Sequence, residues 1–134
     1  MGVKKRNSFA FNWGTTLNSN PWSPNVPLSG TTTGAMASTN TIYSNVQDLG
    51  NFDNAGLIVT WTGTPTGTIS VLVSELGDFF YPLTFNPALT QPAGAPGGYA
   101  VNLNQLPWRF VAIQYSNSSG TGSLFVSLGQ KDLN

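Results

Sequence analysis

The chain has 134 residues, a length that corresponds to one domain. It contains no cysteine and no histidine, which excludes disulfide bonds, thiolate or imidazole catalysis and Cys/His zinc sites. Only 7% of the residues are charged, five basic and five acidic, against about 25% in ordinary soluble domains. We expect much of the surface to be covered by other subunits, which favours a structural subunit over an enzyme. A soluble protein with a neutral, hydroxyl-rich surface is the alternative.

The N-terminus is basic, with Lys4, Lys5 and Arg6 close to Met1. The residues that follow form no apolar stretch long enough for a signal peptide or a membrane span, so we expect the protein to act where it is made or where it assembles. The three cations predict at most a weak contact with packaged nucleic acid through counterion release, and a solvated terminus is the alternative.

Residues 1–35 are predicted to form an extended arm. Pro21, Pro24 and Pro27 exclude a regular helix or a central strand. A disordered tail would be poor in large aromatic rings, but this segment is not. The rings are those of Phe9, Phe11, Trp13 and Trp22. They need a surface to pack on, either the flank of the same domain or a neighbouring subunit, and we expect the neighbour. Deletion of residues 1–30 should then leave the sandwich folded but abolish or weaken assembly.

From residue 36 onward, apolar and polar residues alternate with a period of two, which is typical of β-strands. The expected strands are 41–46, 56–62, 69–74, 79–85, 99–104, 108–115 and 122–128. Turn-forming residues at 63–67 and 117–121 predict two hairpins. Pro82 cannot donate to a strand ladder, so its strand is expected at an edge or with a bulge. The pattern predicts an all-β domain over residues 36–134, an antiparallel sandwich or jelly-roll-like barrel of seven or eight strands.

Catalytic and metal-binding chemistry has few residues to draw on. Glu75 and Asp78 form an acidic pair, and two carboxylates can cleave a glycosidic bond. The stretch from Glu75 to Asp78 is more simply interpreted as a turn between strands. Calcium needs only oxygen ligands such as Asp48, Asp53 or Asp78, but no EF-hand spacing supports such a site. We therefore expect no enzymatic activity, no metal and no cofactor.

Several aromatic residues lie on the face opposite to the main apolar set of their strands, and the strand 108–115 is apolar on both faces. A two-layer sandwich has only one interior, so we expect the second face to be covered by the arm or by another subunit. The predicted assembly interface comprises Phe9, Phe11, Trp13, Trp22, Phe80, Trp108, Phe110 and Phe125.

Trp61 and Trp108 raise a different alternative, a carbohydrate-binding module for host attachment, because flat aromatic rings stack on sugars. Trp61 shares a strand face with Leu57 and Val59, which indicates a core residue instead. A glycan partner would require an exposed Trp or Tyr beside Asn, Gln or Asp side chains in a concave patch.

The stretch from Leu57 to Lys131 resembles small β-sandwich structural proteins of bacteriophages and related viruses. The resembling parts are Trp61-Thr62-Gly63-Thr64-Pro65-Thr66-Gly67, Trp108-Arg109-Phe110 leading to Gln114-Tyr115-Ser116, and Ser119-Gly120-Thr121-Gly122-Ser123-Leu124 with the closing Lys131. The resemblance implies a virion protein of capsid, decoration or spike-associated type, assembled in the host cytoplasm. Its implied partners are copies of itself and other virion proteins.

Overall fold

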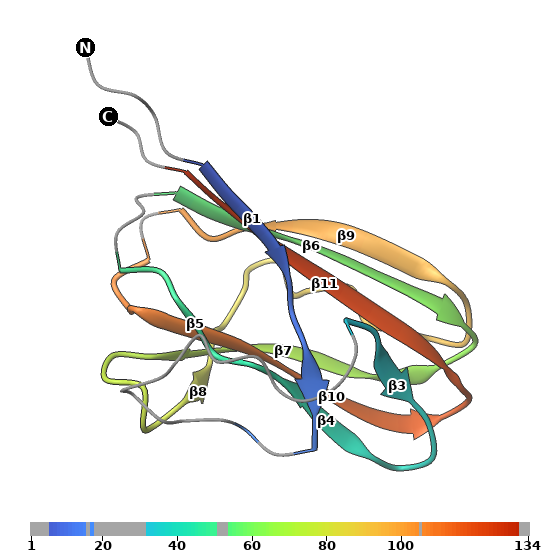
Figure 1. Ribbon diagram of the computed structural model, residues 1–134. Coiled ribbons are helices and arrows are strands. Elements are labelled where there is room, and N and C mark those ends of the chain that lie inside the picture. Colours follow the sequence, from blue (N-terminus) through green and yellow to red (C-terminus); the bar gives the residue numbers. More distant parts are fainter. Residues whose placement is uncertain (1–5, 16, 18–31, 51–53, 105, 132–134) are drawn as a thin grey trace.

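A computed structural model of the chain describes residues 6–15, 17, 32–50, 54–104 and 106–131. These residues form eleven β-strands and no helix, arranged as two antiparallel sheets in a sandwich (Figure 1). The strands are β1 (Arg6–Ala10), β2 (Trp13–Gly14), β3 (Gly34–Met36), β4 (Thr41–Ser44), β5 (Gln47–Asp48), β6 (Asn54–Gly63), β7 (Thr66–Ser74), β8 (Tyr81–Pro82), β9 (Gly97–Asn102), β10 (Phe110–Ser119) and β11 (Gly122–Lys131). The predicted all-β sandwich is confirmed, with more strands than expected.

The two sheets pair strands that are mostly distant in the chain. Sheet A has the order β1-β11-β6-β9, with β3 also on β11; sheet B has the order β2-β4-β10-β7-β8, with β5 also on β10. Neither predicted hairpin forms, because β6 and β7 lie in different sheets, and so do β10 and β11. Each turn instead carries the chain between the sheets, and the two turns touch: the Thr64 amide donates to the Thr121 carbonyl at 2.9 Å. Alternation locates a strand but does not choose its partner.

The core lies between the sheets and is filled by alternate side chains of the four longest strands. Their inward residues are Leu57, Val59, Trp61, Ile69, Val71, Val73, Val111, Ile113, Tyr115, Leu124, Val126 and Leu128. Trp61 is buried, and its Nε1 donates to the Ala95 carbonyl at 2.8 Å. The predicted core role of Trp61 is confirmed, which removes one of the two rings considered for sugar stacking.

The described part of the predicted arm is built into the sandwich. β1 pairs with β11 at an edge of sheet A and β2 pairs with β4 at an edge of sheet B, so the chain crosses between the sheets here (Figure 1). Phe11, at the crossing, is 0% exposed; Trp13 is buried in the same core and Phe9 packs against it. Burial of Phe11 and Trp13 by a neighbouring subunit is therefore wrong, because these rings fill the open side of their own sandwich. Trp22 and the rest of 18–31 lie outside the described residues, and an arm there stays a prediction.

The outer face of sheet B carries a second apolar cluster. Val46, Phe110 and Ala112 are buried there, and Leu17 and Phe80 pack against them. The apolar second face inferred for residues 108–115 is thus covered within the chain, in part by the arm residue Leu17. The prediction that Phe110 lies at an assembly interface is corrected accordingly, since its ring is already buried without a neighbour.

Candidate functional site

The chain leaves β7 through a short turn. The Gly77 amide donates to Ser74 Oγ at 2.9 Å, and Gly77 has a φ of 89°, which glycine adopts without a Cβ clash. The Asp78 carboxylate accepts a hydrogen bond from the Phe79 amide at 2.9 Å. These contacts confirm the turn predicted over residues 75–78, and the turn projects from the end of sheet B.

β8 follows this turn and is the outermost strand of sheet B. Its Tyr81 and Pro82 lie opposite Val73 and Leu72 of β7. The edge position predicted from Pro82 is confirmed, because a residue without an amide proton is tolerated on an edge strand. Among the described residues no further strand lies beside β8, and the Tyr81 ring is exposed.

Trp108 reaches the same region from the start of β10. The first residue of that strand, Phe110, is paired with Ser74 at the end of β7, where the 75–78 turn begins. Between Trp108, the turn and β8 lies a groove of about 660 Å³. We call it the aromatic groove; the residues that characterise it are Glu75, Leu76, Asp78, Phe79, Tyr81 and Trp108.

The aromatic groove concentrates the exposed apolar surface of the molecule. Five large apolar side chains are exposed in the described part of the chain, and four of them line this groove. Their exposed fractions are 67% for Leu76, 73% for Phe79, 70% for Tyr81 and 37% for Trp108. Apolar residues scattered singly over a surface are ordinary, but a contiguous patch marks an interaction site. The groove is therefore the strongest candidate for a binding surface among the described residues.

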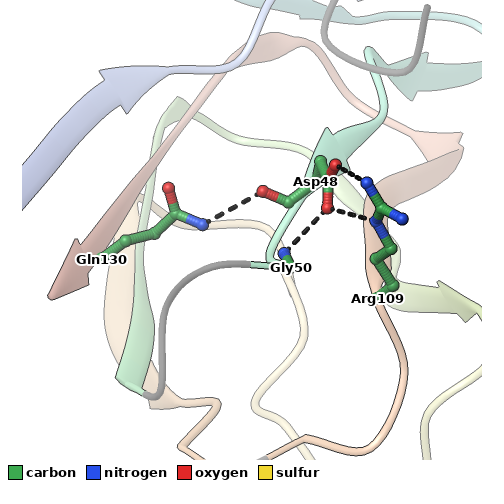
Figure 2. Close-up of polar contacts among 4 residues, drawn as sticks. All are labelled: Asp48, Gly50, Arg109 and Gln130. Atoms are coloured by element: carbon green, nitrogen blue, oxygen red, sulfur yellow. Dashed lines mark hydrogen bonds and ion pairs between the residues drawn. The ribbon is translucent and has the colours of Figure 1, made fainter. Parts of the chain in front are cut away.

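Arg109, next to Trp108, is held by an ion pair with Asp48 (Figure 2). Its Nε and Nη2 donate to the two Asp48 carboxylate oxygens at 2.9 and 2.8 Å, and the Gly50 amide donates to the same carboxylate at 2.8 Å. Burial by itself raises the pKa of Asp48, but the hydrogen bonds from Arg109 and Gly50 outweigh it and hold that pKa below its usual value. The Asp48 hydrogen bond raises the pKa of Arg109. This bidentate pair joins β5 to the residue before β10 and so positions the backbone beside Trp108.

We expect Asp48→Asn to lower the melting temperature at neutral pH and to reduce the acid sensitivity of the fold. The folded pKa of Asp48 lies below its unfolded value, so the pair stabilises the fold above the usual aspartate pKa of about 3.9 and loses this effect as pH falls through the lowered folded pKa. Wild type and variant should converge in strong acid. Thermal melts by circular dichroism across this pH range measure the difference. Asp78→Asn, in the exposed turn, is the control. A difference in melting temperature between wild type and Asp48→Asn that stays constant with pH would contradict the prediction.

The structure separates the predicted interface residues. Within the described chain, Trp108 is the one that lines the aromatic groove. Phe125 is partly exposed on the outer face of sheet A, opposite Thr60. Arg6 begins β1 opposite Lys131, whereas Lys4 and Lys5 lie outside the described residues. A nucleic-acid contact of these cations stays a prediction.

Three groove residues were missed by the sequence patterns: Leu76, Phe79 and Tyr81. The predicted interface included Phe80, but the structure reverses the roles along this segment, because Phe80 packs on the second apolar cluster while Phe79 and Tyr81 are exposed. The sequence signal here is the adjoining turn at 75–78 together with Pro82, which marks an edge segment but does not select which of its rings is exposed. A segment between a turn and an edge proline has little sheet to cover, so alternate large side chains there remain in solvent.

The described part of the chain shows neither a cluster of metal ligands nor a membrane-spanning helix. No group of three or more acidic side chains that could hold a metal ion occurs among these residues. Asp48 is engaged by Arg109, and Asp53 lies outside the described residues. No described segment forms a helix that is long and apolar enough to cross a membrane.

Comparison with known proteins gives a likeness of fold. No family model matches the chain, and no curated protein matches it in sequence. Among solved structures, the SPBc2 prophage-derived protein YomS superposes with a TM-score of 0.50 at 14% identity, over 98% of this chain and 97% of that one. The structure of infectious bursal disease virus Gx strain gives 0.48 at 10% identity, and the enzymatically active domain of tailspike protein 4 from bacteriophage CBA120 gives 0.47 at 13%. This chain spans 33% and 19% of those two chains. The likeness to the prophage-derived protein shows that the two share a β-sandwich fold.

Proposed function

We propose that the chain is a non-catalytic structural subunit of a phage or virus particle, of capsid, decoration or spike-associated type, that docks to other virion proteins through the aromatic groove. The observation that carries the proposal is the concentration of exposed Leu76, Phe79, Tyr81 and Trp108 in one groove. Trp and Tyr are enriched among the residues that dominate interface energies. Burial of apolar surface contributes about 25 cal/mol per Å². A partner that covers these rings therefore gains binding free energy and removes apolar surface that would otherwise be exposed to water.

The composition supports the same proposal. A chain with 7% charged residues has little electrostatic repulsion to keep free copies apart, and it gains from a permanent place in an assembly. The prophage-derived protein has this fold over the same length, so phage genomes encode sandwiches of this size. The proposed location is the virion, after assembly in the host cytoplasm, with copies of the chain itself and other virion proteins as partners.

We expect the chain to be present in purified particles, and the double variant Tyr81→Ala, Trp108→Ala to rebind stripped particles at least about 30-fold more weakly than wild type. Each ring is a candidate anchor, and truncating an interface Tyr or Trp costs about 2 kcal/mol or more when the ring is central to the contact. Mass spectrometry of particles detects the chain, and co-sedimentation with stripped particles measures the affinity.

Ile58→Ala is the matched control for this experiment. Among the described residues, Ile58 is the exposed large apolar side chain outside the groove, on β6 of sheet A, so its truncation removes apolar surface away from the groove. The control should rebind as wild type does, and circular dichroism should show all variants folded. Absence of the chain from particles, or a groove variant that rebinds normally, would refute the proposal.

A glycan ligand is the second candidate, favoured by one specific observation. The groove places the exposed Tyr81 and Trp108 rings in the same hollow as Glu75 and Asp78, and carboxylates beside aromatic faces suit sugar hydroxyls and sugar rings. A glycan array probed with wild type and with Asp78→Ala, which removes the polar group, distinguishes this candidate. Binding that the Asp78→Ala variant loses would favour attachment to a glycan, whereas an array without hits would leave docking to a protein.

A further inference from the structure

β9 forms an edge of sheet A in the part of the chain that the structure describes. It is the last strand in the order β1-β11-β6-β9, and it pairs with β6 from Gly97 to Asn102 without a register shift. Among the described residues no strand lies on its other side, and Figure 1 shows it along the outer margin of the upper sheet. A free edge presents a row of backbone donors and acceptors with which another extended backbone can pair.

The hydrogen-bond pattern identifies which backbone groups face outward. The Leu103 amide donates to the Ala55 carbonyl at 2.9 Å, just beyond the β9–β6 ladder and in the same register. In an antiparallel pair the residues alternate between those that bond to the partner and those that point away from it. Tyr99 and Val101 therefore bond to β6, whereas Gly98, Ala100 and Asn102 direct their amides and carbonyls to the open edge.

β9 lacks the features that protect the other edges of the sandwich. Its sequence, Gly-Gly-Tyr-Ala-Val-Asn, contains no charge and no proline. The sheet B edges are only two residues long, and β8 contains Pro82. In sheet A, β3 has only three residues, and β1 begins at Arg6, opposite Lys131. Charges, proline and short length are the usual devices against edge pairing, so β9 is the unprotected edge of the described chain.

We propose that β9 pairs antiparallel with β9 of a second copy, around a twofold axis at Ala100, and so joins two A sheets into one continuous sheet. The strand is self-complementary in this register: Ala100 faces its own equivalent, and Gly98 of each copy faces Asn102 of the other. All three outward-directed residues then find a backbone partner, and no like charges meet across the seam. The side chains involved are small or neutral and are exposed in the single copy, so none has to leave the core. This contact uses an element separate from the aromatic groove and does not rest on the proposed function.

The decisive variant is Ala100→Lys, which keeps the backbone amide but brings two ammonium groups together at the seam. Ser123→Lys is the matched control, because it adds the same charge to the outer face of sheet A on β11, two strands away. Sedimentation velocity over a concentration series should show a dimer for wild type and for Ser123→Lys. For Ala100→Lys the dimer dissociation constant should rise about fivefold.

Hydrogen exchange on the wild-type protein tests the same proposal without a substitution. The amides of Gly98, Ala100 and Asn102 should exchange more slowly as the protein concentration rises, while those of Tyr99 and Val101 are slow at every concentration. A wild type that stays monomeric would overturn the proposal. A dimer that survives Ala100→Lys, or in which the three edge amides stay fast, would overturn it too and would show that the copies meet elsewhere. Neither outcome affects the particle-rebinding test of the groove.

Discussion

Replacing Phe11 with alanine is expected to lower the free energy of unfolding by about 3–5 kcal/mol, a large share of the roughly 5–15 kcal/mol that stabilises a typical domain. The ring is fully buried where the chain crosses from sheet A to sheet B. The Phe11 amide donates to the Val126 carbonyl at 3.0 Å, and Asn12 and Asn45 exchange two hydrogen bonds at 2.8 and 2.9 Å. A backbone held this firmly cannot collapse into the cavity that the substitution leaves. Urea denaturation followed by tryptophan fluorescence measures the loss.

Phe9→Ala is the matched control for this prediction. The Phe9 ring meets that of Phe11 edge-on, with centroids 6.1 Å apart, but it is only partly buried, so its truncation should cost clearly less. The burial of Phe11 also reverses the expected effect of deleting residues 1–30: the truncated chain should now fail to fold, because it loses β1 and β2. A Phe11→Ala variant that unfolds at the wild-type urea concentration would show that the crossing is not part of the core.

Replacing Asn117 with alanine is expected to cost about 3 kcal/mol of stability. This buried side chain accepts a hydrogen bond from the Tyr115 hydroxyl at 2.7 Å and donates to the carbonyls of Ser38 at 2.7 Å and Gly120 at 3.1 Å. Alanine removes all three bonds and leaves a buried hydroxyl and two carbonyls without this partner. An unsatisfied buried group costs more than the bond contributed, so the loss should exceed that of a surface asparagine. Thermal and urea unfolding both measure it.

A double-mutant cycle with Tyr115→Phe separates the network from its parts. If the Tyr115 hydroxyl and the Asn117 amide act through their shared hydrogen bond, the two losses should not add, because the second substitution removes a group that has already lost its partner. Strictly additive losses would contradict a coupled pair. Asn40→Ala is a useful comparison, since the backbone bond from the Asn117 amide to the Asn40 carbonyl does not depend on the Asn40 side chain.

The strands and their inward faces could be predicted because period-two alternation is a local property. Leu57, Val59 and Trp61 face the core as their spacing indicates, and the same holds for Ile69, Val71 and Val73. Strand partners could not be predicted in this way. The turn at 63–67 is compatible with a hairpin or with a connection between sheets, and only contacts with the distant turn at Thr121 decide for the second.

The candidate site depended still more on tertiary structure. Trp108 could be selected from the sequence, because its strand is apolar on both faces, but Phe79 and Tyr81 could not be distinguished from Phe80. Which of three consecutive aromatic residues is exposed depends on what covers each face of the sheet. Here Phe80 packs against the cluster of Val46, Phe110 and Ala112, and its neighbours are left in solvent.

Composition by itself excluded cysteine and histidine chemistry, and alternation by itself predicted a single all-β sandwich. Both are local properties of the sequence, so neither depends on contacts between distant residues. Only the tertiary structure decided that Phe11 and Trp13 close their own sandwich, that the aromatic groove lies beside β8, and that no described strand lies on the outer side of β9. These features depend on strand pairing and burial across the whole chain, which arise from side chains far apart in the sequence.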